Sequence, residues 1–108
     1  MDRIKIKNKF NGRCAYCGEI LKDRFHVDHI QSKRTGGLNV DDNYYPACQS
    51  CNIRKSTLSI EQFRKEIKRD IIQLRRDSAK FRTLERFGLI FENKIEIVFY
   101  YEKANNFI

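Results

Sequence analysis

The chain has 108 residues, 41% of them apolar, and carries 22 Lys and Arg against 14 Asp and Glu, for a formal charge of +8. This length allows about one domain with a modest core, and the apolar runs are too short to cross a bilayer. The composition therefore excludes a membrane-spanning protein and favours a polyanionic partner, because basic side chains release the counterions condensed on phosphates. Met1-Asp2-Arg3 leads into charged residues, so we expect no signal peptide and a cytoplasmic protein.

The first half of the chain predicts short extended elements. Residues 1–13 alternate Ile4 and Ile6 with basic residues, which indicates an extended lead ending at the Asn11-Gly12 turn. Alternation over 24–30 and an aromatic stretch over 43–47 predict two short strands joined by a glycine-containing loop.

The second half predicts helices followed by a hairpin. Ser59 to Gln62 is a capping-box signature, and the apolar residues that follow recur every three or four positions, as in an amphipathic helix. A second helical stretch after Asp77 stops at Gly88, although one long bent helix also fits. Alternation over 95–101 predicts a strand that pairs back with 89–91 as a terminal β-hairpin.

Four cysteines form two CxxC pairs, Cys14 with Cys17 and Cys48 with Cys51. In a reducing cytosol this spacing favours a metal site over disulfides, and four thiolates suit a tetrahedral structural Zn²⁺. Two alternatives remain: small buried hydrophobic cysteines, and a site made of one CxxC pair with His26 and His29. The second alternative would leave the other CxxC pair without a role.

Polar side chains other than the cysteines are concentrated between and just after the two pairs. Phosphodiester hydrolysis needs a base for water and a hard cation on the scissile phosphate. His29 can supply the base, while Asp28 and Asn52 can supply oxygen ligands to Mg²⁺ or Mn²⁺, which keep several waters. Asp28 and His29 are adjacent, so they converge on one substrate only if the strand ends or twists there.

At this point the sequence resembles the HNH endonucleases, a family with the ββα-metal (His-Me finger) fold. The matching parts, within residues 10–56, are Cys14-x-x-Cys17, Val27-Asp28-His29-Ile30, Gly36-Gly37, Asn43 and Pro46-Ala47-Cys48-x-x-Cys51-Asn52-x-x-Lys55. The stretches 84–90 and 99–102 also resemble the tails of small phage-type members. Asn52 departs from the family name, since it stands where the last H is expected, but its carboxamide oxygen can still bind a cation.

The resemblance implies a role for each central residue. Asp28 and Asn52 would hold the catalytic ion, His29 would be the general base, and Asn43 would orient the loop that carries His29. It further implies an α+β protein in which a ββα-metal finger, stapled by a four-cysteine zinc site, precedes amphipathic helices and a C-terminal β-hairpin. We expect one HNH nuclease domain over 1–108, with its core in 10–56, a basic helical segment in 57–88 and the hairpin and tail in 89–108.

Each role has an ordinary structural alternative. Asn43 can be a turn residue, Asn52 a helix cap, and His26 a plain strand position instead of a phosphate contact or a partner of the metal site. Lys55 lies three residues after Asn52, on the same helix face, where it can meet phosphate or solvent. The expected DNA-contacting residues are Lys55, Arg54, Lys33, Arg34 and His26.

The partner is expected to be DNA, cut with low sequence selectivity, because no element clearly presents base-reading side chains. Most basic residues in 54–86 are interspersed with acidic ones and predict a solvated face with weak ion pairs. A phage packaging or other DNA-processing partner and a homodimer are further expectations for a bacterial or phage-encoded protein. Two competing hypotheses are a non-catalytic zinc-stabilised DNA-binding or adaptor module, and a coloured redox or iron–sulfur protein.

Overall fold

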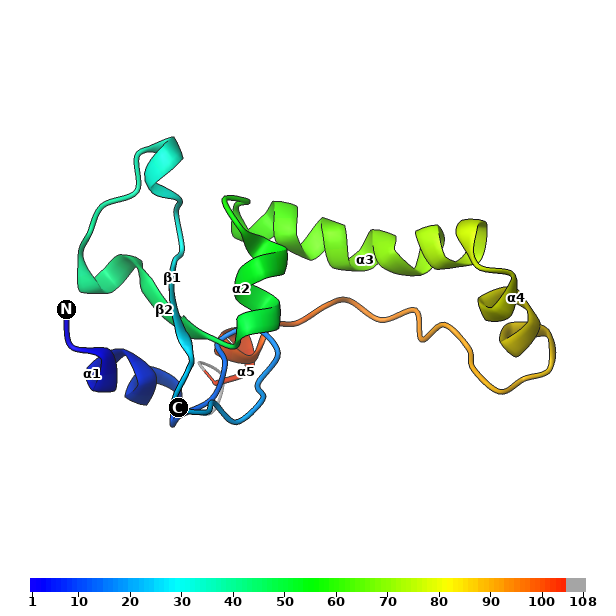
Figure 1. Cartoon of the computed structure of the whole chain (residues 1–108), viewed down its shortest axis with the longest axis horizontal. Coiled ribbons are helices and arrows are strands. Elements are labelled where there is room, and N and C mark those ends of the chain that lie inside the picture. The colour runs from blue at the N-terminus through cyan, green and yellow to red at the C-terminus, as the bar shows by residue number, and fades with distance from the viewer. Residues whose placement is uncertain (105–108) are drawn as a thin grey trace. The chain divides into compact units, whose positions relative to one another are not determined.

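The computed structural model describes residues 1–104 and mixes helices with one small sheet, so the α+β class is confirmed (Figure 1). Residues 1–60 and 98–104 form one compact unit, here called the cysteine unit, and residues 61–97 form a second, the helical unit. The elements in chain order are α1 (Arg3–Lys7), η1 (Asn8–Phe10), β1 (His26–His29), η2 (Lys33–Thr35), η3 (Asp41–Asn43), β2 (Tyr44–Ala47), α2 (Gln49–Lys55), α3 (Ile60–Asp77), α4 (Ala79–Arg86) and α5 (Tyr100–Ala104).

The two predicted strands form an antiparallel pair, with Asp28 opposite Tyr45 and His29 opposite Tyr44. The loop between them contains Gly36 and Gly37, as expected. Gly37 is required there, because a Cβ would lie 1.8 Å from the backbone oxygen of Gln31. Helix α2 follows β2 directly, so the cysteine unit contains a β-β-α succession (Figure 1).

The prediction of an extended N-terminal lead was wrong, because residues 3–7 form helix α1. Asp2 caps this helix by accepting hydrogen bonds from the backbone N–H groups of Ile4 and Lys5. Ile4 is 69% exposed and Ile6 only 1%, whereas a strand would place both on the same face. The turn predicted at Asn11-Gly12 is confirmed, since both residues have positive φ angles.

The predicted C-terminal hairpin is also wrong. Residues 90–99 form no strand, and residues 100–104 form the short helix α5. The N–H of Phe99 donates to the Glu102 carboxylate, which is half of a capping box and starts a helix where alternation suggested a strand. The rings of Phe99 and Tyr101 then pack against Tyr16 of the cysteine unit.

The helical unit contains α3 and α4, and the predicted start of α3 after Ser59 and end of α4 before Gly88 are both confirmed. Leu89 and Gly88 donate backbone hydrogen bonds to Leu84 and Glu85 in a Schellman motif, with φ +72° at Gly88. Arg64 pairs with Glu61 and Arg69 with Glu66, which are the expected surface ion pairs at helical spacing. Among residues 1–104, no helix is both long and apolar enough to span a membrane.

Candidate metal centre and active site

The four cysteines come together in the cysteine unit. Their sulfur atoms all lie within 4.8 Å of one another, and the Sγ atoms of Cys17 and Cys48 are 3.8 Å apart. Four sulfurs bound tetrahedrally at the usual zinc–sulfur length would be about 3.8 Å apart. The cluster is thus positioned to bind a metal ion, and neither histidine belongs to it, which favours the four-cysteine site over the mixed one.

Backbone amides surround the cluster, as expected for CxxC turns. The N–H of Tyr16 points at the sulfur of Cys14, and the N–H of Cys51 points at the sulfur of Cys48, each at 3.4 Å. Hydrogen bonding with Cys51 lowers the pKa of the Cys14 thiol to about 4, whereas burial raises the pKa of Cys17 to about 11. The pKa of the Cys14 thiol is thus lowered while that of its neighbour Cys17 is raised, so the two sulfurs of the first CxxC pair differ in acidity.

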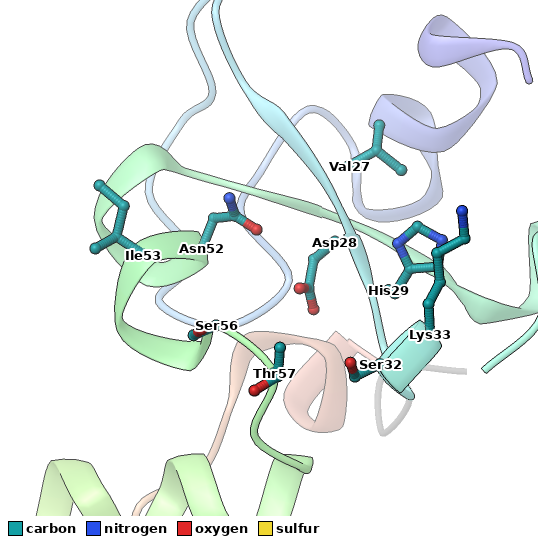
Figure 2. A pocket seen from close by; sticks show the side chains of 9 residues that line it. All are labelled: Val27, Asp28, His29, Ser32, Lys33, Asn52, Ile53, Ser56 and Thr57. Carbon is teal, nitrogen blue, oxygen red and sulfur yellow. The ribbon is translucent and has the colours of Figure 1, made fainter. Parts of the chain in front are cut away.

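A cavity of about 450 Å³ lies beside β1 and α2 (Figure 2). Three of the predicted catalytic residues line it: Asp28 and His29 from β1 and Asn52 from α2. Adjacent strand residues can line the same cavity only if the strand ends or twists between them. Strand β1 does end at His29, so Asp28 and His29 can both line this cavity. The remaining lining residues are Val27, Ser32, Lys33, Ile53, Ser56 and Thr57.

The Asp28 carboxylate is almost fully buried, with 4% of the residue exposed. Its Oδ2 atom accepts a hydrogen bond from the Tyr16 hydroxyl at 2.5 Å and forms a 3.0 Å ion pair with Lys55 Nζ. No residue in the described part of the chain donates a hydrogen bond to Oδ1. One oxygen is therefore held by the protein, and the other is left to the cavity that Asp28 lines.

Burial dominates the electrostatics of this carboxylate. Desolvation raises the pKa of Asp28 above its ordinary value, although Tyr16 and Lys55 both act to lower it. Burial likewise raises the pKa of Tyr16, and the nearby Asp28 charge adds to the effect, so the phenol stays protonated and remains a donor.

The His29 ring is fixed by two neighbours. Its Nε2 atom lies 2.9 Å from Asn39 Oδ1, and the ring packs edge-on against Tyr44 with centroids 5.1 Å apart. An amide oxygen can only accept, so Nε2 carries the proton in the neutral ring and Nδ1 keeps its lone pair. His29 thus has an acceptor nitrogen available for chemistry.

Asn43 does not line the cavity, but its hydrogen bonds stabilise the loop between β1 and β2. Its Oδ1 accepts from the N–H of Gln31 at 2.8 Å, and its Nδ2 donates to the carbonyls of Gln31 and Leu38 at 3.0 and 2.9 Å. The Asn43 carbonyl also accepts from Ile30 N–H at 2.9 Å. These bonds fix the chain on both sides of the loop that starts just after His29.

The residues predicted to contact DNA are placed differently from one another. Lys33 lines the cavity and Arg34 follows it, exposed, in η2, whereas His26 lies at the other end of β1 and is not a lining residue. Arg54 is exposed. The structure contradicts a phosphate contact by Lys55, because its side chain is 0% exposed and is paired with Asp28. Helical spacing placed Lys55 on the face of Asn52 but could not tell that the lysine points inward.

Sequence reasoning also missed Tyr16 and Asn39. Tyr16 lies inside the first CxxC pair and Asn39 ten residues after His29, and neither contact follows from periodicity or spacing. An available signal was Tyr16 itself, since a tyrosine hydroxyl that becomes buried usually finds a hydrogen-bond partner.

Comparison with known proteins identifies the central segment, because residues 14–58 match the family model described as HNH endonuclease. The resemblance to the HNH endonucleases is confirmed for this segment. The protein of Bacillus subtilis (strain 168) named "SPbeta prophage-derived putative HNH endonuclease YoqL" is 34% identical over 71 residues, which is 55% of this chain and 30% of that protein. The chain thus spans less than a third of that relative's length. No solved structure gives a significant match.

The HNH segment, residues 14–58, contains both the cysteine cluster and the cavity described above. It holds all four clustered cysteines and every residue that lines the cavity. The family match therefore covers the part of the cysteine unit that carries both features.

Proposed function

We propose that this chain is a metal-dependent HNH endonuclease that hydrolyses DNA phosphodiester bonds. The observation that carries the proposal is the convergence of Asp28, His29 and Asn52 on one cavity within the HNH segment. A carboxylate, an imidazole with a free acceptor nitrogen and a carboxamide are the groups that hydrolysis with a hard cation requires. The β-β-α succession that presents them is proposed to be the ββα-metal finger.

The donor set fits a magnesium-class ion. Asp28 offers the Oδ1 atom, which has no donor within the described residues, and Asn52 offers a neutral carboxamide oxygen from the adjacent helix (Figure 2). Mg²⁺ and Mn²⁺ favour oxygen ligands and keep several waters, so two protein oxygens are sufficient. A cation held there would supply charge stabilisation to the phosphate and its leaving oxygen.

His29 is proposed to be the general base. Its Nδ1 atom accepts the proton of a water while the water oxygen forms a bond to phosphorus and the bond to the departing sugar oxygen breaks. Asn39 holds the proton on Nε2, so that Nδ1 is the basic nitrogen. Asn43 is proposed to fix the loop that starts after His29, through its three side-chain hydrogen bonds.

The sulfur cluster is proposed to hold a structural Zn²⁺. Four thiolates leave no open position for substrate, which is typical of structural sites. The cysteine unit has only short regular elements, so a bound ion would contribute much of its stability.

DNA is the proposed substrate, with Lys33, Arg34 and Arg54 as backbone contacts. Lys33 lines the cavity next to the proposed base, and Arg34 follows it in the same exposed turn. The net charge of +8 favours a polyanion of this kind. A role for His26, a DNA-processing partner and a homodimer remain predictions without support from the geometry.

One observation favours the alternative of a non-catalytic DNA-binding module. The buried Asp28–Lys55 ion pair can be a purely structural contact that occupies the carboxylate. The alternative predicts tight DNA binding without cleavage under any divalent ion.

Plasmid nicking in Mg²⁺ or Mn²⁺ separates the two functions. We expect the wild-type protein to nick supercoiled DNA, and His29→Ala to lose activity by about 10²–10⁴-fold, the usual contribution of a general base. His26→Ala is the matched control, because it removes the other histidine of the same strand. Equal activity of the wild type and His29→Ala would contradict the proposal.

A further inference from the structure

The carboxylate proposed to bind the catalytic ion is held by two side chains from the segments that carry the CxxC pairs. Tyr16 lies between Cys14 and Cys17, and Lys55 lies four residues after Cys51 on helix α2. Both bind the same atom, Asp28 Oδ2, at 2.5 and 3.0 Å. Asp28 is therefore contacted by one residue from the segment of each CxxC pair.

Tyr16 is itself firmly placed. Its N–H points at the Cys14 sulfur, and its carbonyl accepts a hydrogen bond from Tyr100 N–H at 3.0 Å. The ring meets Phe99 and Tyr45 edge-on, with centroid distances of 5.4 and 6.2 Å. The position of the Tyr16 hydroxyl is thus fixed, because the backbone N–H points at a cluster sulfur and the ring packs against aromatic neighbours.

Lys55 gives a second rigid contact. The side chain is fully buried, and its Nζ also donates to the carbonyl of His29 at 2.8 Å. The same ammonium group therefore touches both Asp28 and the backbone of the proposed base. A solvated lysine could not fix these two groups, because its charge would favour water over a defined geometry.

We propose that Tyr16 and Lys55 are positioning residues that connect the sulfur cluster to the catalytic ion site through Asp28. By occupying Oδ2, they turn Oδ1 toward the cavity and fix the carboxylate for a divalent cation. The inference rests on the proposed function, since it assumes that Asp28 is a ligand of that cation. The cluster then has a second role, because it sets the geometry of a metal ligand outside its own coordination shell as well as holding the fold.

The test measures Mn²⁺ binding by the intact zinc-loaded chain, using the electron paramagnetic resonance signal of free Mn²⁺. Tyr16→Phe keeps the ring and removes only the hydroxyl bonded to Asp28. We expect it to bind Mn²⁺ about tenfold more weakly, the lower end of the usual cost of losing a partner of a metal ligand. Its zinc content and melting temperature should stay close to the wild-type values.

Tyr45→Phe is the matched control, because Tyr45 belongs to the same aromatic cluster but its hydroxyl is not bonded to Asp28. It should bind Mn²⁺ as the wild type does. Replacement of Lys55 is a poorer test, since it would leave the Asp28 charge buried without its ion-pair partner and could unfold the protein.

The outcomes distinguish this inference from the proposed function. Mn²⁺ binding that is the same in the wild type and Asp28→Ala would contradict the catalytic ion site, and with it the inference. Binding that depends on Asp28 but is unchanged in Tyr16→Phe would contradict the inference alone. Weaker Mn²⁺ binding accompanied by loss of zinc from Tyr16→Phe would make Tyr16 part of the cluster's own structure and would also overturn the positioning role.

Discussion

The sulfur cluster and the proposed catalytic cavity lie in the same HNH segment but are built in opposite ways. The cluster gathers four like atoms in a closed set, with all sulfurs within 4.8 Å of one another. The cavity gathers unlike groups, a carboxylate, an imidazole and a carboxamide, around about 450 Å³ of open space. A closed sulfur set suits a permanent structural ion, while an open oxygen and nitrogen set suits an ion that must also meet substrate.

The largest expected effect comes from breaking the cluster. Cys14 is fully buried, and Cys14→Ser removes one of four ligands. Because structural zinc commonly contributes about 10–16 kcal/mol of apparent folding free energy, we expect the variant to lose zinc and its cooperative thermal transition. Circular dichroism melting and metal analysis measure both effects.

Ser50→Ala is the matched control for that change, since Ser50 is an exposed residue between Cys48 and Cys51. It should keep one zinc per chain. A Cys14→Ser protein that melts like the wild type would show that the cluster does not support the fold.

Changes in the cavity should affect activity and leave the fold intact. His29 is partly exposed and Tyr44 packs against its ring, so His29→Ala removes little buried area. The loss of nicking described above should therefore come with a nearly unchanged melting temperature. A large drop in melting temperature would assign His29 to the structure instead of the chemistry.

The Asp28 site should also respond to pH. Burial raises the pKa of Asp28, and a protonated carboxyl cannot bind a cation. Mn²⁺ affinity should thus fall as the pH is lowered through the range above about 4 in which an exposed aspartate stays ionised. Titration of Mn²⁺ at several pH values measures this, and an affinity constant over the range would count against the site.

A smaller effect is expected at Asn39. Asn39→Ala removes the partner of His29 Nε2 and should lower the turnover rate by about tenfold with little change in KM, because the ring loses its orientation. Asn39→Asp places a negative charge beside the ring, which stabilises the imidazolium form. Its activity should therefore disappear at a higher pH on the acid side than that of the wild type, and an unshifted profile would argue against the contact.

Much of the central segment could be predicted because its signals are local. The CxxC spacing placed four sulfurs together, and alternation over 24–30 and 43–47 gave the strand pair in the correct order. The serine signal gave the start of α3 and the glycine signal gave the end of α4 nearly to the residue, whereas the break between the two helices was left open.

The errors occurred where the outcome depends on contacts distant in sequence. Two isoleucines two residues apart cannot distinguish a strand from a short helix, and burial of Ile6 alone decides the case. The C-terminal alternation was overridden when Phe99 and Tyr101 packed against Tyr16, more than 80 residues earlier. Lys55 was predicted to contact a DNA phosphate because a lysine side chain is usually solvated. Its buried position is explained by the ion pair with the buried Asp28 carboxylate.

The most direct test of the division between the two sites is a crystal of the wild-type protein soaked in Mn²⁺ and measured at the manganese and zinc absorption edges. We predict zinc alone among the four cysteine sulfurs and manganese alone between Asp28 and Asn52. A single ion at the cysteines, with His29 or Asp28 among its ligands and nothing in the cavity, would contradict the account.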